Sequence, residues 1–354
     1  MATSKEYGLG QFEFPRGWFM VADASEATTT PKPLRFFGQD MVLYRGESGR
    51  VVLMDAYCPH MGTHLGKNAT SFVIQDKTHV EGDNIRCPYH AWRFGPDGKC
   101  NQIPYFNGPI PAAAKIRTWR VEERYGCLFT WHDPEGGDPD FDIPSIPEWD
   151  DPSWVRWKID HLGQIKSHSI ELLDNMADVA HLGPTHGAPA QYFRNEITDH
   201  VLRQLQGGKH RSLGEGGAML ETDTWYTGPG ILLSRYVNSN SLMIITHTPV
   251  DDGTVQAWTA LLVQSPNKVA TEADVAMARA YQEAATAAFA QDFEIWANKA
   301  PCFAPLQIPA DGPFGRVRAW YRQFYNPRAE AKSVHQQLNG TYTVRGFPDR
   351  ASAA

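Results

Sequence analysis

The stretch Ser167–Gly187, SHSIELLDNMADVAHLGPTHG, carries the pattern around which the rest of the chain can be arranged. Asn175, Asp178 and His181 follow one another at three-residue intervals, so they would lie near one face of a helix. A Gly-Pro pair then ends that helix. His186 follows on the broken end, where it can turn back towards His181. The stretch therefore predicts a helix whose C-terminal end brings two imidazoles together.

Two histidines so placed can bind one metal ion and leave room for a third ligand. Two His and one carboxylate on one side of Fe(II), with the other positions open, form the site of non-haem iron oxygenases. A pair of histidines five residues apart beside a Gly-Pro also occurs without any metal. The spacing alone therefore leaves both interpretations open.

Composition excludes several classes of protein. The 354 residues allow two domains or one large one, and 42% apolar content is ordinary for a globular protein. A formal charge of −7 and the lack of a basic run argue against a nucleic-acid surface. We expect a cytoplasmic protein without a membrane span, because the sequence shows neither a signal-peptide apolar core nor a long apolar stretch. Five cysteines point to thiols, metal ligands or core residues and not to a disulfide framework.

Two Cys-His pairs give the strongest chemical signal, C-P-H at 58–60 and C-P-Y-H at 87–90. In a Rieske [2Fe–2S] centre, two thiolates bind one iron and two imidazoles bind the other. The expected ligands are Cys58 and Cys87 for one iron, and His60 and His90 for the other.

A structural zinc ion is the rival interpretation, because it uses the same residue types. Zinc fingers usually pair Cys with Cys and His with His, whereas here each loop supplies one of each, which favours the cluster. His64 and His79 lie nearby but do not fit the ligand pattern. We expect His64 to hydrogen-bond the backbone and His79 to be exposed to solvent.

The surrounding pattern predicts two domains. Residues 14–56 and 115–133 carry short apolar runs separated by Gly, Pro and Asp, as in an all-β domain. The segment DPEGGDPDFDIPSIPEWDD, 133–151, is rich in Pro, Gly and acidic residues and predicts a linker. We therefore expect an all-β domain over 14–137 and a second domain over 138–354.

The second domain is expected to combine strands and helices. Residues 198–264 return to a strand pattern, so a curved sheet should cover the helix of the opening stretch. Residues 1–13 are expected to pack on this domain, and the tail after about 340 is expected to be loosely held. The predicted fold class is α+β.

A carboxylate is needed to complete the metal site, and Asp292 is the candidate. It lies in an Ala-rich helix predicted over Glu272–Ala300, on the same apolar stripe as Phe289 and Trp296. Glu294 points to the opposite face, as a solvated carboxylate would. A charge within an apolar stripe costs several kcal/mol unless it is paired or binds a metal. An exposed Asp without any ligand role is the alternative.

These residues resemble the large (alpha) subunit of Rieske non-haem iron oxygenases over most of the chain. Shorter segments resemble the oxygenase component of 3-ketosteroid 9α-hydroxylase. They are FPRGW at 14–18, FGQD at 37–40, DAYCPH at 55–60, RFGPDG at 93–98, IPY at 103–105, QDFEIW at 291–296 and DGPFGRVRAWYRQFY at 311–325. The run at 291–296 resembles the segment that carries the iron carboxylate in the family. One departure is a longer interval between the Cys-His loops, with the surplus in a polar loop at 67–83.

The resemblance implies the function. It implies an all-β Rieske domain and a catalytic domain of the helix-grip type, which would hold a [2Fe–2S] cluster and a mononuclear Fe(II). The reaction would be O2-dependent monooxygenation of an apolar, polycyclic, steroid-like substrate, in a pocket lined from 225–248 and 285–305. Since the sequence has no GxGxxG fingerprint, electrons should come from a separate NADH-dependent flavin/iron–sulfur reductase, or from a ferredoxin and its reductase.

Asp178 and Asn175 have expected roles beside the iron. Asp178 lies three residues before His181, so it could accept a hydrogen bond from that ring and orient it. In the family the equivalent Asp bridges to a Rieske histidine of the neighbouring subunit. This implies a homotrimer in which His90 reaches Asp178 of the next copy. Asn175 is expected to lie near the iron without binding it strongly.

Other functions remain open at this stage. A Rieske oxygenase that dihydroxylates or demethylates an aromatic, or one that desaturates a sterol, would share the same iron site. A Rieske ferredoxin, which only carries electrons, would need about the first 130 residues alone. The remaining residues and the second set of ligands argue against a ferredoxin.

Overall fold

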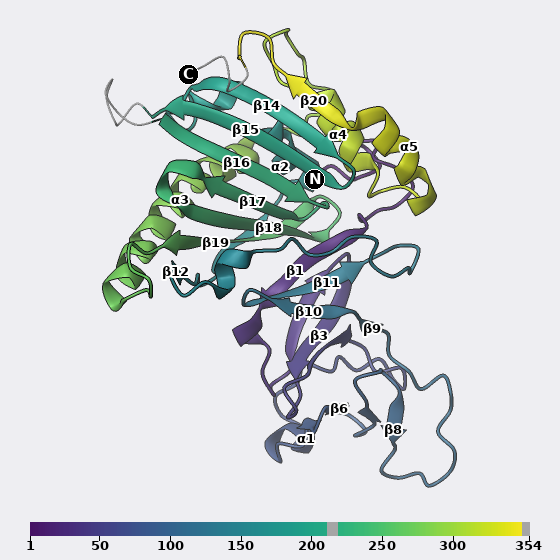
Figure 1. Ribbon diagram of the computed structural model, residues 1–354. Coiled ribbons are helices and arrows are strands. Elements are labelled where there is room, and N and C mark those ends of the chain that lie inside the picture. The colour runs from purple at the N-terminus through teal and green to yellow at the C-terminus, as the bar shows by residue number, and fades with distance from the viewer. Residues whose placement is uncertain (211–218, 349–354) are drawn as a thin grey trace. The chain divides into compact units, whose positions relative to one another are not determined.

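The computed structural model describes residues 1–210 and 219–348. The chain divides into two compact units. The smaller unit is Met20–Trp131, and the larger unit joins Met1–Phe19 to His132–Ala354. Figure 1 labels the elements of both units.

The smaller unit consists of small sheets, which are short because turn residues interrupt the apolar runs. Gly98, with φ +76°, is one such residue; a Cβ there would lie 2.0 Å from the carbonyl oxygen of Ile116, so only glycine fits. The sheets have the strand orders β1-β11-β10, β2-β3-β4-β9 and β5-β6-β7-β8. Their bounds are β1 (Gly17–Asp23), β2 (Lys32–Phe36), β3 (Gln39–Arg45), β4 (Val51–Asp55), β5 (Val80–Glu81), β6 (Asn84–Arg86), β7 (Arg93–Phe94), β8 (Cys100–Gln102), β9 (Thr118–Trp119), β10 (Val121–Arg124) and β11 (Cys127–His132).

The loop at 67–83 contains some regular structure, the short helix α1 (Phe72–Gln75) and the strand β5. A buried apolar core lies between the sheets and includes Val42, Met54 and Phe94. Cys58 and Cys87 belong to this same core. Both cysteines are therefore held by the packed interior of the unit.

The larger unit contains a nine-stranded antiparallel sheet of order β12-β19-β18-β17-β16-β15-β14-β20, in which β13 also pairs with β19. Alternating burial along β15 and β16 shows that one set of side chains faces the interior. The bounds are β12 (Trp154–Val155), β13 (Asp160–Ile165), β14 (Ala190–Thr198), β15 (Val201–Lys209), β16 (Met219–Thr227), β17 (Ile231–Tyr236), β18 (Ser241–Asp251), β19 (Thr254–Gln264) and β20 (Gly340–Thr343).

The long helix α3 (Glu272–Asn298) confirms the helix expected over 272–300. It begins with a capping box, in which Thr271 and Asp274 each bond the other's backbone N–H. The remaining helices are α2 (Ser169–Leu173), α4 (Phe314–Arg322) and α5 (Arg328–Leu338).

Helices α2 and α3 pack against the same part of the sheet. Leu172 of α2 and Trp296 of α3 share an apolar core with Val255 and Ala257 of β19. Figure 1 shows α3 running across the sheet. This packing sets the distance between the opening stretch of the sequence and Asp292.

Both ends of the described chain are anchored in the larger unit. Ser4 donates its backbone N–H to Asp252 at 2.8 Å, and the Tyr7 hydroxyl donates to Glu171. The expectation of a loose tail after 340 is wrong for β20, which pairs with β14. The reason is that β14 would otherwise leave an unpaired edge; residues 349–354 of the expected tail lie outside the described residues.

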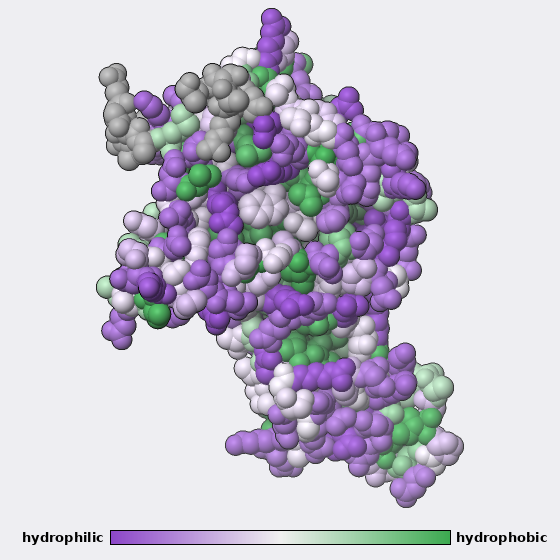
Figure 2. All heavy atoms as spheres, viewed as in Figure 1, coloured by the Kyte–Doolittle hydropathy of each residue, from purple (hydrophilic) through white to green (hydrophobic). Residues whose placement is uncertain are grey.

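The predicted α+β class is confirmed, with an all-β unit and an antiparallel sheet covered by helices. Within residues 1–210 and 219–348, no helix is long and apolar enough to cross a membrane. On the face drawn in Figure 2, apolar side chains form small groups among polar ones.

Candidate metal centres

The two Cys-His loops have the same backbone pattern. Each cysteine N–H donates to the carbonyl five residues later, and each cysteine carbonyl accepts from the N–H four residues later, at 2.7–3.0 Å. The residues four after Cys58 and Cys87, Gly62 and Ala91, both have positive φ, +71° and +55°. This turn folds each loop around its sulfur.

The sulfur atoms of Cys58 and Cys87 are neighbours. The N–H groups two and three residues after each cysteine also point to its sulfur. The hydrogen bond between the two thiols lowers the pKa of Cys87 and raises the pKa of Cys58. Without a metal, Cys87 therefore favours the thiolate and Cys58 keeps its proton as the donor.

The two histidines form a second, more exposed pair. The rings of His60 and His90 lie 4.7 Å apart, and the ring of Trp92 stacks on His60 at 4.4 Å. For the part of the chain that is described, these Cys and His donors do not converge within 4.8 Å, as ligands of one zinc ion would. An inner pair of sulfurs and an outer pair of imidazoles fit a two-iron cluster.

The neighbouring histidines behave differently. His64 accepts the Gly66 N–H at Nδ1, 3.0 Å away, which confirms its expected backbone contact. The expectation that His79 is exposed is wrong. It is half-buried, and its Nε2 lies 2.8 Å from the Leu65 carbonyl.

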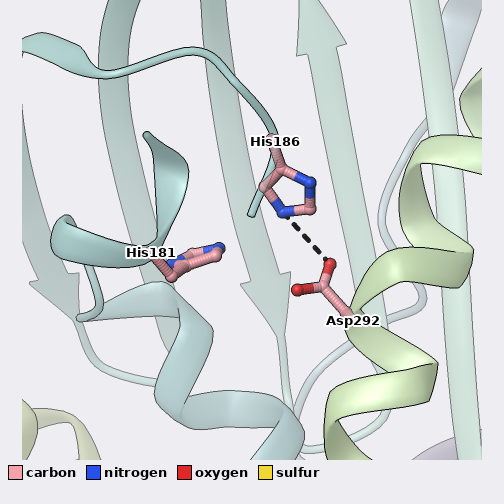
Figure 3. Close-up of side chains that lie close together, drawn as sticks. All are labelled: His181, His186 and Asp292. Atoms are coloured by element: carbon pink, nitrogen blue, oxygen red, sulfur yellow. Dashed lines mark ion pairs between the residues drawn. The ribbon is translucent and has the colours of Figure 1, made fainter. Parts of the chain in front are cut away.

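The larger unit brings His181, His186 and Asp292 together (Figure 3). One ligand atom from each lies within 4.8 Å of the others. The Nε2 of His186 is 3.3 Å from Oδ2 of Asp292. Among the described residues, no other cluster of three such side chains converges in this way. His181 and His186 thus meet Asp292, from a distant part of the sequence, in the two-His, one-carboxylate arrangement expected from the sequence.

The opening stretch is not the continuous helix that the spacing predicts. After α2 the chain tightens into a 3-10 turn at Asp174–Met176, and a second one follows at Ala180–Leu182. The break lies at Asp178, whose carboxylate accepts the N–H of Ala180 at 3.1 Å and of His181 at 3.2 Å. Such side-chain bonds compete with a helix, and they start a new turn here.

This turn changes the contact between Asp178 and His181. The Nδ1 of His181 lies 2.6 Å from the backbone carbonyl of Asp178 and 3.7 Å from its carboxylate. The carbonyl therefore fixes the ring tautomer, with Nδ1 protonated and Nε2 facing the site. Burial raises the pKa of Asp178, but the hydrogen bonds and charge of His181 and the N–H of Ala180 together outweigh it, so the pKa is lowered.

Two amides orient the other site residues. The Oε1 of Gln291 lies 3.0 Å from Nδ1 of His186 and can accept a hydrogen bond from it. Asn175 donates to Oδ1 of Asp292 at 3.2 Å. Hydrogen bonding to Asp292 raises the pKa of His186. The role of Gln291 was not predicted, although its place directly before Asp292 was visible in the sequence.

A network of ion pairs around α2 was also missed. Arg318 of α4 binds both carboxylate oxygens of Asp174, at 2.9 and 2.5 Å. Glu171, 2% exposed, binds Lys299 and Tyr7. The arginine lies within the quoted 311–325 segment, but no spacing in the sequence pairs it with residue 174. The network ties α2 to α4 and to the end of α3.

A cavity of about 480 Å³ opens beside His186 and Asp292, which both line it. Its helical wall presents small residues of α3, such as Ala285 and Ala288, with Phe289. Its sheet wall includes Leu232 and Ile245, crossed by polar side chains such as Gln206. This agrees with the lining expected from 225–248, although it also draws on β15 and on α3 from Tyr281 onward.

Comparison with known families covers both units. Residues 17–119 match the Rieske [2Fe-2S] domain, and residues 130–325 match the 3-ketosteroid 9alpha-hydroxylase C-terminal domain. The chain is therefore a Rieske-type monooxygenase, and its smaller unit carries a Rieske [2Fe–2S] centre.

Curated relatives give the narrower assignment. The chain is 33% identical, over 88% of its own length and 82% of the other, to the 3-ketosteroid-9-alpha-monooxygenase oxygenase component of Mycolicibacterium smegmatis. It is 29% identical to a cholesterol 7-desaturase of Caenorhabditis elegans, over 88% and 77%. The chain belongs to the family of 3-ketosteroid 9α-monooxygenase oxygenase components, and as such it works with a separate reductase.

Solved structures share the fold. Caffeine-bound NdmA of Pseudomonas putida CBB5 has a TM-score of 0.71 at 18% identity, covering 98% of this chain and 99% of that one. Apo dicamba monooxygenase has a TM-score of 0.64 at 20% identity, covering 91% and 100%. At these identities the likeness concerns the fold alone.

Proposed function

We propose that the chain hydroxylates a 3-ketosteroid, as the names of its curated relatives suggest. The observation that carries this proposal is the convergence of two imidazoles and one carboxylate beside a 480 Å³ cavity. That volume falls within the range of about 300–1,000 Å³ typical of small-molecule sites. The mostly apolar walls suit a polycyclic substrate, and the polar side chains across the sheet suit its oxygen atoms.

The same geometry supports the ligand sets that we propose. The mononuclear iron is bound by His181, His186 and Asp292. The cluster is bound by Cys58, Cys87, His60 and His90. Iron in a two-His, one-carboxylate site supplies the activation of dioxygen when it is bound. The chain itself holds the ligands through the Asp178 carbonyl and Gln291, and its α3 face positions the substrate.

We assign the [2Fe–2S] cluster to a domain at 14–137, and the mononuclear iron with the substrate site to a domain at 138–354. Electrons arrive from a separate NADH-dependent reductase in the cytoplasm. The cluster loops are a suitable docking surface for the reductase, because large apolar side chains are exposed around them. These are Tyr57, Met61, Tyr89, Tyr105 and Phe106.

A homotrimer would let electrons pass between copies, from His90 of one chain to Asp178 of the next. Asp178 and His181 line a surface hollow of about 410 Å³ in the larger unit. Leu306, 98% exposed, lies on its rim. An open surface of mixed polar and apolar residues next to His181, with an exposed leucine on its rim, is a suitable place for a second copy to dock.

The test is turnover with NADH, O2 and a Rieske reductase on a panel of 3-ketosteroids, other sterols and small aromatics, with products identified by mass. A steroid that gains one oxygen supports the proposal. A sterol that loses two hydrogens, or an aromatic that gains two oxygens or loses a methyl group, contradicts it.

A further inference from the structure

A second, smaller chamber of about 110 Å³ adjoins the 480 Å³ cavity. His181 and Asn175 line the smaller chamber, whereas His186 and Asp292 line the larger cavity. A substrate held beside the three ligand-type residues can therefore extend into both spaces. The residues that line both are Leu182, Gln204, Thr224, Leu232, Ile245 and Phe289.

The two spaces differ in their access to solvent. The larger cavity is lined in part by exposed residues, among them Ser239 and Tyr281. Every residue that lines the smaller chamber is buried or half-buried. We therefore expect a substrate to enter through the larger cavity and to place its leading end in the smaller chamber.

The smaller chamber is lined by a buried polar pair, Tyr226 of β16 and His247 of β18. The hydroxyl of Tyr226 lies 2.8 Å from Nε2 of His247, and the two residues are 2% and 0% exposed. His247 lies on the same face of β18 as Ile245, two residues earlier, which lines both spaces. Neither member of the pair has a part in the function proposed above.

The hydrogens of this pair follow from their partners. Burial lowers the pKa of His247 to about 3, so its imidazole is neutral and carries one N–H. Burial raises the pKa of Tyr226, so its hydroxyl keeps its hydrogen. Within residues 1–210 and 219–348, Nε2 of His247 is the only hydrogen-bond partner of this hydroxyl and therefore accepts from it. The imidazole hydrogen then lies on Nδ1.

This Nδ1–H has no hydrogen-bond partner among the described residues. A buried donor without an acceptor is costly, and native structures rarely keep one without a ligand or a water molecule. We propose that Nδ1–H of His247 donates to a carbonyl oxygen at the leading end of the substrate. His247 would then select ketones among apolar molecules of similar shape.

The other amide donors of the smaller chamber are already engaged. Gln204 donates through Nε2 to the carbonyls of Asn175 and Met176, both at 3.1 Å. Asn175 donates to Asp292 at 3.2 Å. A site that donates to a substrate oxygen rejects the analogue without it, because the buried N–H stays unpaired. The selection therefore falls to His247.

The inference rests on the proposed function for the steroid skeleton, and the 3-ketone is taken as the recognised oxygen because it defines the proposed substrate class. The test is calorimetric binding to the anaerobic holoenzyme, which does not require turnover. The probes are androst-4-ene-3,17-dione, androst-4-en-3-one and androst-4-en-17-one. We expect the two 3-ketones to bind at least about tenfold more tightly than androst-4-en-17-one, as is typical for one buried hydrogen bond.

Three variants assign this preference to a side chain. His247→Phe keeps a ring and removes the N–H, so the preference should fall to about onefold. His247→Gln keeps a donor and should retain part of it. Thr246→Val is the control, because Thr246 is 1% exposed on the same strand and lines neither space; it should keep the wild-type preference. Iron and labile sulfide should be unchanged in all three.

Equal binding of the two monoketones by the wild type would overturn the role of His247 alone, because steroids would still bind. A preference that survives in His247→Phe would overturn it as well. If the preference depends on His247 but the dione loses two hydrogens on turnover, the proposed hydroxylation fails and the recognition stands. Wild-type protein that binds none of the three steroids would overturn both.

Discussion

Asp292 is a carboxylate whose surroundings make sense only with a cation. It is 6% exposed, and its two oxygens face the amide of Asn175 and the imidazole of His186. Burying one negative charge against neutral groups is unfavourable. A metal ion bound at this point would compensate it.

We therefore predict that Asp292→Asn loses the mononuclear iron and keeps the cluster. The substitution preserves size and removes the charge. Wild-type protein should contain more iron than labile sulfide, whereas the variant should contain equal amounts, with an unchanged electron paramagnetic resonance signal of the reduced cluster. Glu294→Gln is the control, since Glu294 lies two residues later on the exposed face. An Asp292→Asn protein that retains the excess iron would remove Asp292 from the ligand set.

Asp178 combines a structural and an electrostatic role, and two substitutions separate them. Asparagine can still accept the backbone N–H groups of Ala180 and His181, whereas alanine cannot. If Asp178 bridges to a neighbouring chain, both Asp178→Asn and Asp178→Ala should keep both metal centres and lose turnover by at least about tenfold. Stopped-flow measurement of cluster oxidation by O2 would locate the loss in electron transfer. Near-normal turnover in Asp178→Asn would reduce the residue to a local turn former.

At the scale of the element, one face of α3 lines the cavity and the opposite face is exposed to solvent. Ala284, Ala285 and Ala288 line the cavity, so the helix can approach the sheet while leaving space between them. Alanine also favours the helix itself. A flat ring system fits such a gap between a helix and a sheet.

A larger side chain on this face should act on binding. We predict that Ala285→Leu raises KM for the steroid by about tenfold, as is typical when a few methylene groups change the fit of an apolar pocket. The kcat and the melting temperature should change little. Ala287→Leu is the matched control, because Ala287 is exposed and does not line the cavity. Equal effects of the two substitutions would mean that the cavity does not hold the substrate.

At the scale of the whole molecule, the proposed assembly places the cluster of one chain against the iron of another. Asp292→Asn lacks the iron and His90→Ala impairs the cluster, so each should be inactive alone. Co-expressed with different affinity tags and purified through both, mixed assemblies should regain turnover. If electrons pass only within a single chain, the mixed assemblies should regain no turnover. Light scattering on the same samples should show three copies per particle.

Much of the fold was predictable because it rests on local pattern. Turn residues divided the first 133 residues into short strands, and the apolar stripe of residues 272–298 defined α3. The helix at the opening stretch was mispredicted because the Asp178 side chain bonds the backbone and restarts the turn. The strand β20 was missed because only a long-range edge on β14 makes it form.

The sequence by itself determined the donor set. Cys-His loops and the His181/His186 pair are set by spacing over a few residues, and the placement of Asp292 follows from helical period. Tertiary structure alone decided the contacts around these donors: Gln291 on His186, Asn175 on Asp292, and Arg318 on Asp174. These contacts join residues that are far apart in the sequence. Packing of the sheet against α2, α3 and α4 brings them together, and no local periodicity encodes them.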